Sequence, residues 1–207
     1  INLSLGGSSY SSAVFRAVQR ARNQDILLVT AAGNDGADND ETGSYPANFK
    51  IDNIISVAAT DASGQLANYS NFGATSVHLA APGSSILSTY PFDTGNGLYR
   101  TLSGTSMASP HVAGIVGLIS AANPTLSASQ VRSLLLSTTQ PLTSLQGAVI
   151  TQGLSDARAA VSASLTTVGL GRLTGIVRDS NKRALSGARV AVRSRTTPGT
   201  SKRTSTI

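Results

Sequence analysis

Residues 103–114 read Ser-Gly-Thr-Ser-Met-Ala-Ser-Pro-His-Val-Ala-Gly and open a long apolar run. Pro110 fits only the first turn of a helix, because proline has no backbone N–H to donate. The run therefore predicts a buried helix over 108–122, ended by Asn123-Pro124. A helix N-terminus presents unpaired N–H groups, so developing negative charge at a Ser106 nucleophile would be stabilised there. The alternative is that Ser106 merely caps the helix, as serines at helix starts commonly do.

The segments before this helix predict a parallel sheet. Residues 1–5 form a strand pattern that ends at two glycines. A helix follows whose apolar side chains share one face: Val14, Ala17, Val18 and Ala21. Residues 26–32 and 54–60 are continuous apolar strands, typical of strands buried on both faces of a parallel sheet. Shorter strands are expected at 77–80 and 86–89. This βαβ pattern indicates the α/β class.

Two more helices are expected after the central one. Ser127 and Gln130 have the spacing of a capping box, which predicts a helix that ends near Thr138. Another short helix fits residues 155–164. The segments 33–53 and 61–76 are rich in Gly, Asn, Asp and Ser and are expected to be loops.

The charge of the chain is divided unevenly along its length. Residues 1–167 hold 7 basic and 9 acidic side chains, whereas residues 168–207 hold 9 basic residues and only Asp179. The net charge of +6 therefore belongs to the tail and does not indicate a nucleic-acid-binding protein. The tail contains two alternating patterns, 173–181 and 188–193, which predict strands joined by a turn. A flexible linker is the alternative for this segment.

Composition excludes several classes of protein. The chain has no cysteine, which excludes a disulfide framework, a thiolate zinc site and a Cys nucleophile. No stretch approaches about 18 consecutive apolar residues, so we expect no membrane segment. Ile1 already lies in a strand-like run, without a starting Met or a signal peptide. We therefore expect the chain to be part of a longer polypeptide.

The motif at 103–114 closely resembles the nucleophile segment of the subtilisin-like serine proteases. The hydrolase elbow Gly-x-Ser-x-Gly does not fit, because Ala108 stands at its fifth position. Ser4-Leu5-Gly6-Gly7 and Ala31-Ala32-Gly33-Asn34-Asp35 match further segments of that family in the same order. The resemblance covers about residues 1–165. It implies a three-layer α/β fold with a mostly parallel central sheet, of which this chain would hold the C-terminal part.

The resemblance also implies roles for individual residues. Ser106 would be the nucleophile, with Asn34 and the Ser106 N–H as the oxyanion hole. The expected substrate-binding residues lie on the edge strand and on the pocket segment: Ser4, Leu5, Gly6, Ala31 and Gly33. A strand that ends in glycines leaves its backbone open to an extended peptide. Parallel sheets place ligands beyond the carboxyl ends of strands, where Asn34 lies. The alternative for Asn34 is a simple turn residue.

The resemblance leaves the general base unassigned. In this family the Asp and His of the triad precede the serine, and the chain has only two histidines. His111 matches a framework histidine, which we expect to be buried and hydrogen-bonded. His78 stands where relatives often place an acidic ligand of a weak cation site. Without the triad Asp and His, we expect this chain to be inactive on its own.

We assign no metal ligand and expect no cofactor for the chemistry. The acidic residues of the loop, Asp35, Asp38, Asp40 and Glu41, lack the spacing of an EF-hand, so a solvated loop is expected. Structural calcium would be a property of the intact protein.

We interpret residues 1–167 as the C-terminal part of a peptidase domain. Residues 168–207 resemble a linker and the start of a β-sandwich module of the carboxypeptidase-regulatory-like type. The expected protein is a secreted serine endopeptidase that acts on proteins or peptides. The alternative is a non-catalytic peptide-binding or adhesion protein that retains the fold.

Overall fold

A computed structural model describes residues 1–93, 97–167, 189–192 and 203–206. The chain divides into two compact units, Ile1–Gly169 and Leu170–Ile207. The strands of the first unit are β1 Asn2–Leu3, β2 Leu28–Ala31, β3 Ile54–Thr60, β4 Leu79–Pro82, β5 Ile86–Asp93, β6 Gly97–Leu102, β7 Gln140–Pro141 and β8 Gly153–Leu154. Its helices are α1 Ser12–Asn23, α2 Thr105–Ala122, α3 Ala128–Ser137, α4 Ala157–Thr166 and the short 3₁₀ turn Thr143–Leu145.

The central sheet has the strand order β1-β2-β3-β4-β8-β7. All neighbouring pairs are parallel except β7 with β8. The strand predicted at 54–60 matches β3 at both ends. Every residue of β2 and β3 is buried, as expected for strands covered on both faces. The expected α/β fold with a mostly parallel sheet is therefore confirmed.

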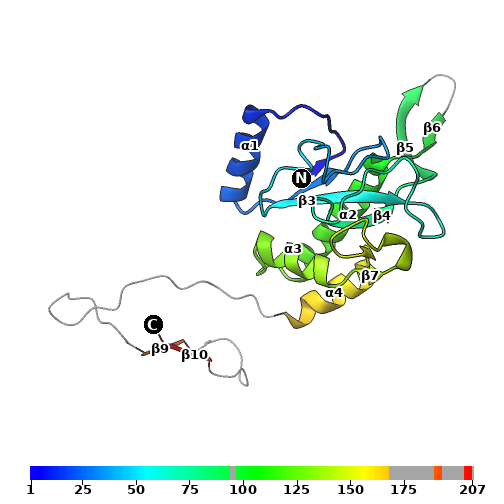
Figure 1. Cartoon of the computed structure of the whole chain (residues 1–207). Coiled ribbons are helices and arrows are strands. Elements are labelled where there is room, and N and C mark those ends of the chain that lie inside the picture. Colours follow the sequence, from blue (N-terminus) through cyan, green and yellow to red (C-terminus); the bar gives the residue numbers. More distant parts are fainter. Residues whose placement is uncertain (94–96, 168–188, 193–202, 207) are drawn as a thin grey trace. The chain divides into compact units, whose positions relative to one another are not determined.

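Alternate residues of β3 face different layers. Ile55, Val57 and Ala59 join the apolar cluster that contains the buried face of α2 and residues of α3 and α4. Ile54 packs with Val18 of α1 on the opposite face. Figure 1 shows α1 on one side of the sheet and α3 and α4 on the other. The period-two alternation of one buried strand thus organises three layers.

The central helix begins earlier than the apolar run predicts. It starts at Thr105, so Pro110 is the sixth residue of α2 and lies beyond the first turn, contrary to expectation. Pro110 cannot donate to the carbonyl of Ser106, four residues before it. The Ser4 hydroxyl donates to that oxygen instead, at 2.8 Å. A contact from β1 therefore replaces the missing helical hydrogen bond.

The length and composition of α2 would allow a membrane span. Its 18 residues have a mean hydropathy of 1.2, so the exclusion argued from the sequence was too strong. Buried core helices pass the same test, and α2 contacts β1 to β4 as well as α3 and α4. Length and composition alone are therefore weak evidence that α2, in the described part of the chain, crosses a membrane.

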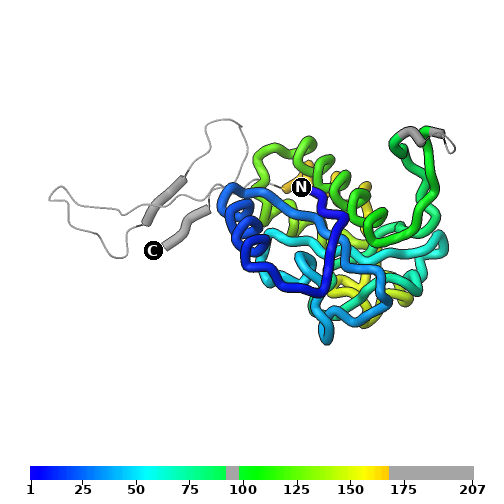
Figure 2. The backbone as a smooth tube through the Cα atoms, turned by 90° about the horizontal axis from the view of Figure 1, so that it is seen from above, coloured from blue at the N-terminus to red at the C-terminus, as the bar shows by residue number. Residues whose placement is uncertain are grey.

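A hairpin of β5 and β6 was only partly predicted. Its strands are antiparallel, and it projects from the body of the unit in both views (Figures 1 and 2). Leu87 and Tyr99 are exposed on it. Because neither face is fully covered, its apolar residues do not alternate with polar ones, and only the segment near 86–89 gave a strand pattern.

The second unit contains β9 Arg189–Val192 and β10 Arg203–Thr206, which pair in antiparallel fashion. The expected strand at 173–181 lies outside the described residues. The accessory module therefore stays a prediction.

Gly83 joins the sheet to the loop before α2. It follows β4, and its carbonyl accepts a hydrogen bond from Gly104 N at 2.9 Å. A Cβ at Gly83 would lie 2.6 Å from the Ala59 Cβ and 2.8 Å from the Gly104 oxygen. There is therefore no room for a side chain at this junction.

We predict that Gly83→Ala lowers the free energy of unfolding by about 1–3 kcal/mol, because the added methyl overpacks the junction. The matched control is Gly117→Ala in α2, where a Cβ would meet nothing within 4 Å. That change should raise stability by about 1 kcal/mol through helix propensity. Urea titration of each variant measures both effects. Equal stability of Gly83→Ala and the parent chain would contradict the close packing.

Candidate active site

Ser106 is the second residue of α2. The N-cap is Gly104, with φ of 156° and no side-chain capping bond, so the alternative of Ser106 as a helix cap is wrong. Within the described ranges, the Ser106 N–H makes no hydrogen bond. The Ser106 hydroxyl donates to the Ser4 carbonyl oxygen over 3.4 Å, which is a long and weak hydrogen bond. The N–H is therefore free to bind a ligand, and the hydroxyl has only a weak hydrogen bond to give up.

Asn34 is fixed by the start of α2. Its Oδ1 accepts hydrogen bonds from Thr105 N at 2.8 Å and from Thr105 Oγ1 at 3.0 Å. The Thr105 hydroxyl is also 3.2 Å from both the N and the O of Gly33. Because the amide oxygen is held by two donors, Nδ2 is left as a donor on the other side of the group. The first turn of α2 and the end of β2 thereby form one rigid junction.

A cavity of about 410 Å³ lies beside this junction. It brings together six residues predicted for the site: Leu5, Gly6, Ala31, Gly33, Asn34 and Ser106. Ser4 does not line the cavity but contacts Ser106 directly. The other walls of the cavity are mostly small or polar residues, including Thr42 and Ser44. The arrangement combines a hydroxyl, an amide donor and a small-walled pocket.

The edge segment after β1 is open for pairing. Gly7 forms an isolated antiparallel bridge with Tyr45, with N–O distances of 3.0 and 2.8 Å. Among the described residues, the backbone groups of Leu5 and Gly6 make no backbone hydrogen bond. These groups are available to an extended chain that enters the cavity.

Within the described residues, His111 makes no hydrogen bond with Ser106. Its Nδ1 donates to the carbonyl oxygen of Met107 at 2.8 Å, one helical turn away. The prediction of a hydrogen bond is correct, but the prediction of burial is wrong, because His111 is exposed. It lies on a face of α2 with the exposed Leu118, whereas the opposite face packs on the sheet.

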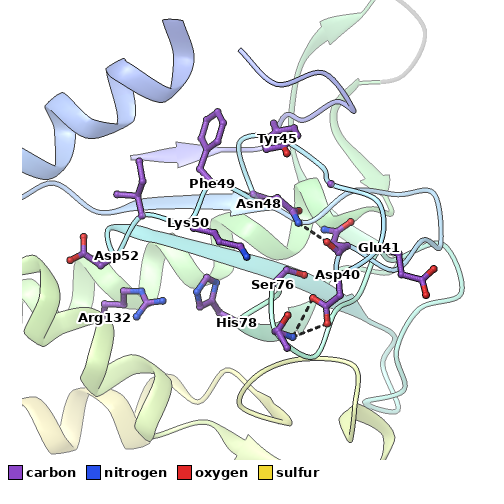
Figure 3. Close-up of a pocket in the computed structure, with 15 residues that line it drawn as sticks. Asp40, Glu41, Tyr45, Asn48, Phe49, Lys50, Asp52, Ser76, His78 and Arg132 are labelled. Atoms are coloured by element: carbon purple, nitrogen blue, oxygen red, sulfur yellow. Dashed lines mark hydrogen bonds between the residues drawn. The ribbon is translucent and has the colours of Figure 1, made fainter. Parts of the chain in front are cut away.

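His78 lines a second cavity, of about 610 Å³, with Lys50, Ser76 and Arg132 (Figure 3). The Ser56 N–H donates to His78 Nδ1 at 2.9 Å, so the ring proton sits on Nε2. Burial lowers the pKa of His78 to about 4, and the positive charge of Arg132 acts in the same direction. His78 is therefore a neutral structural side chain near pH 7 and lies outside the cavity that holds Ser106.

Two of the acidic residues of the loop 33–53 accept hydrogen bonds from backbone N–H groups, one from the loop 61–76 and one from their own loop. Asp40 accepts from the Thr75 N–H at 3.0 and 3.3 Å (Figure 3), and Asp38 Oδ1 accepts from Asp40 N. In the part of the chain that the structure describes, no three His, Asp or Glu side chains gather as a metal site.

Two residues of the candidate site were not identified from the sequence. Thr105 anchors the Asn34 amide, and Asn71 lines the cavity from the loop after β3. Thr105 could have been found from its position, because a hydroxyl next to a helix-start nucleophile can reach a neighbouring loop. Asn71 lies 36 residues from its partner Asp35, and no local pattern indicates that contact.

Comparison with known proteins agrees with this geometry. The Subtilase family model matches residues 1–171. The chain belongs to the subtilase family. The predicted subtilisin-like resemblance is therefore confirmed.

Several subtilases are similar to this chain. Subtilisin DY of Bacillus licheniformis is 50% identical over 139 residues, which cover 67% of this chain and 48% of that protein. An extracellular protease of Xanthomonas campestris is 44% identical over 170 residues, or 80% of this chain and 28% of that protein. A solved protease structure from Pseudoalteromonas arctica has a TM-score of 0.70 and 36% identity, and covers 79% of this chain and 50% of that one. This subtilase chain thus spans half or less of each of them.

The neutral state of His78 makes stability depend on pH. The unfolded chain binds a proton at His78 near pH 6.5 and the folded chain only near pH 4. Between these values the unfolded state holds more protons, so stability falls as the pH falls, by up to roughly 3 kcal/mol in total. We predict that His78→Asn, which keeps an acceptor for Ser56 N–H, removes much of this loss. Urea titrations at pH 7 and pH 4.5 compare the two proteins, and an equal loss in both would contradict the assignment.

Proposed function

We propose that the intact protein is a serine endopeptidase in which Ser106 is the nucleophile. The observation that carries this proposal is the anchoring of Asn34 Oδ1 by Thr105, which leaves the Nδ2 donor beside the first turn of α2. The free Ser106 N–H supplies a second donor. Two fixed donors next to a hydroxyl are the arrangement that acyl transfer requires.

The reaction follows from these groups. Ser106 Oγ attacks the carbonyl carbon of the scissile peptide bond and gives its proton to a base. The carbonyl oxygen becomes an oxyanion that accepts from Asn34 Nδ2 and the Ser106 N–H. The tetrahedral species then expels the amine, which takes the proton, and water hydrolyses the ester on Ser106. Asn34 acts mainly on the transition state, because it binds charge that forms only there.

The base comes, in this proposal, from another part of the intact protein. Neither histidine of this chain lines the cavity with Ser106, and among the described residues neither ring hydrogen-bonds the Ser106 hydroxyl: His111 contacts Met107 and His78 contacts Ser56. A serine without a base keeps its hydroxyl proton and attacks poorly. The 207-residue chain is therefore expected to show no peptidase activity by itself.

The substrate is proposed to be an extended polypeptide. Its backbone would pair with Leu5 and Gly6, and one side chain would enter the cavity of about 410 Å³. Similarity to an extracellular protease supports secretion of the intact protein. The family match ends at residue 171 and the basic tail begins at 168, which supports a peptidase unit over 1–167 followed by an accessory module over 168–207.

A fusion protein tests the role of Ser106. In it, this chain replaces the segment of subtilisin DY that aligns with it, and subtilisin DY supplies the rest. We predict turnover of a fluorogenic peptide and labelling of Ser106 by a fluorophosphonate, with both lost in Ser106→Ala. Ser109→Ala is the matched control, since Ser109 is buried and donates to Asn2 Oδ1. It should retain turnover. Labelling of another serine in a folded fusion would contradict the assignment.

Asn34→Ala in the same fusion should lower kcat about 10²–10³-fold with little change in KM, the magnitude known for removal of this donor from subtilisin itself. Steady-state kinetics separate the two constants. A raised KM with unchanged kcat would make Asn34 a substrate contact or a turn residue instead.

A further inference from the structure

The loop that carries Asn34 is held by one buried side chain, that of Asn71. Asn71 is 2% exposed, and its Oδ1 accepts from Asp35 N at 2.8 Å and from Ala37 N at 3.2 Å. Its own backbone N–H donates to the Gly33 carbonyl at 3.0 Å. Asn71 therefore binds the chain on both sides of Asn34.

The orientation of the Asn71 amide is itself fixed. Its Nδ2 donates to Asn39 Oδ1 at 3.0 Å, and Asn39 Nδ2 donates to the Ala32 carbonyl at 2.9 Å. Asn39 is also 2% exposed. An inverted Asn71 amide would place its oxygen against Asn39 Oδ1 and leave Asp35 N facing an NH₂ group. The buried pair thus has one satisfied arrangement.

Close packing leaves the loop little freedom. Gly33 has φ of +122°, and a Cβ on it would lie 2.3 Å from Asn71 Nδ2. The same network reaches the cavity wall, because Asn48 donates to the Asn39 carbonyl and accepts from Ser44 N at 3.1 Å. Asn71 and Ser44 both line the cavity that holds Ser106.

We propose that Asn71 is a positioning residue for the oxyanion donor, acting through the loop 33–37. This inference rests on the proposed function. Thr105 holds the Asn34 side chain at the helix, and Asn71 holds the backbone from which that side chain extends. Preorganised donors act only when they are held within about 0.5 Å of the productive geometry. Loss of Asn71 therefore weakens transition-state binding more than substrate binding.

Kinetics of the fusion protein test the coupling. Asn71→Leu keeps the shape of the side chain and removes its hydrogen bonds, so kcat should fall at least about tenfold. In an Asn34→Ala background the same change should lower kcat less than about twofold, because the donor it positions is already gone. The control is Asn53→Leu, remote from the cavity, which removes bonds from a buried Asn53 to the Val18 and Ile26 carbonyls. It should lower stability but leave kcat unchanged.

An equal kcat loss for Asn71→Leu in both backgrounds would overturn the proposal. A merely structural role would lower kcat by the same factor whether or not Asn34 is present. An unchanged kcat in the Asn34-containing fusion would also overturn it. A second measurement needs no activity and uses the 207-residue chain itself. By NMR, Asn71→Leu should shift the side-chain amide signal of Asn34 and speed hydrogen exchange at Asp35 and Ala37 at least about tenfold. An unmoved Asn34 signal would overturn the positioning role, even if the fusion proved inactive.

Discussion

The pair of hydrogen bonds between Thr105 and Asn34 Oδ1 is the constraint on which the site depends. It joins the amino end of α2 to the loop after β2, two segments 71 residues apart. A parallel sheet brings the carboxyl ends of its strands to one edge, and a helix that starts at that edge directs its free N–H groups there. The contact orients one amide and also aligns the helix that carries Ser106.

The helix start is constrained a second time by Pro110. Proline in the sixth position of α2 leaves the Ser106 carbonyl without its helical donor, and the Ser4 hydroxyl fills this position. Ser4 belongs to the segment expected to pair with substrate, so one contact connects the nucleophile to that segment. A feature that weakens the helix thus ties it to the edge of the sheet.

Local patterns predicted the elements that have a buried face. The continuous apolar run 54–60 gave both ends of β3, and the Ser127–Gln130 capping box gave the start of α3. The exposed β5–β6 hairpin shows little alternation of apolar and polar residues, because neither of its faces is fully buried. The helix start at Thr105 was missed because Pro110 normally marks a first turn, and only the contact from Ser4, distant in sequence, makes this position tolerable. Most of the site residues predicted from the quoted motifs line one cavity, whereas the contact of Asn71 with Asp35 joins residues too far apart in sequence for a local pattern to indicate it.

The central claim is that Ser106 N–H and Asn34 Nδ2 face one point beside the Ser106 hydroxyl. The most direct measurement is a crystal structure of the active fusion protein with a peptide aldehyde, which adds to a serine hydroxyl as a hemiacetal. The account predicts a bond from Ser106 Oγ to the aldehyde carbon, with the former carbonyl oxygen about 2.7–3.1 Å from both donors. A hemiacetal oxygen that points away from Asn34, or an aldehyde bound at another residue, would contradict it.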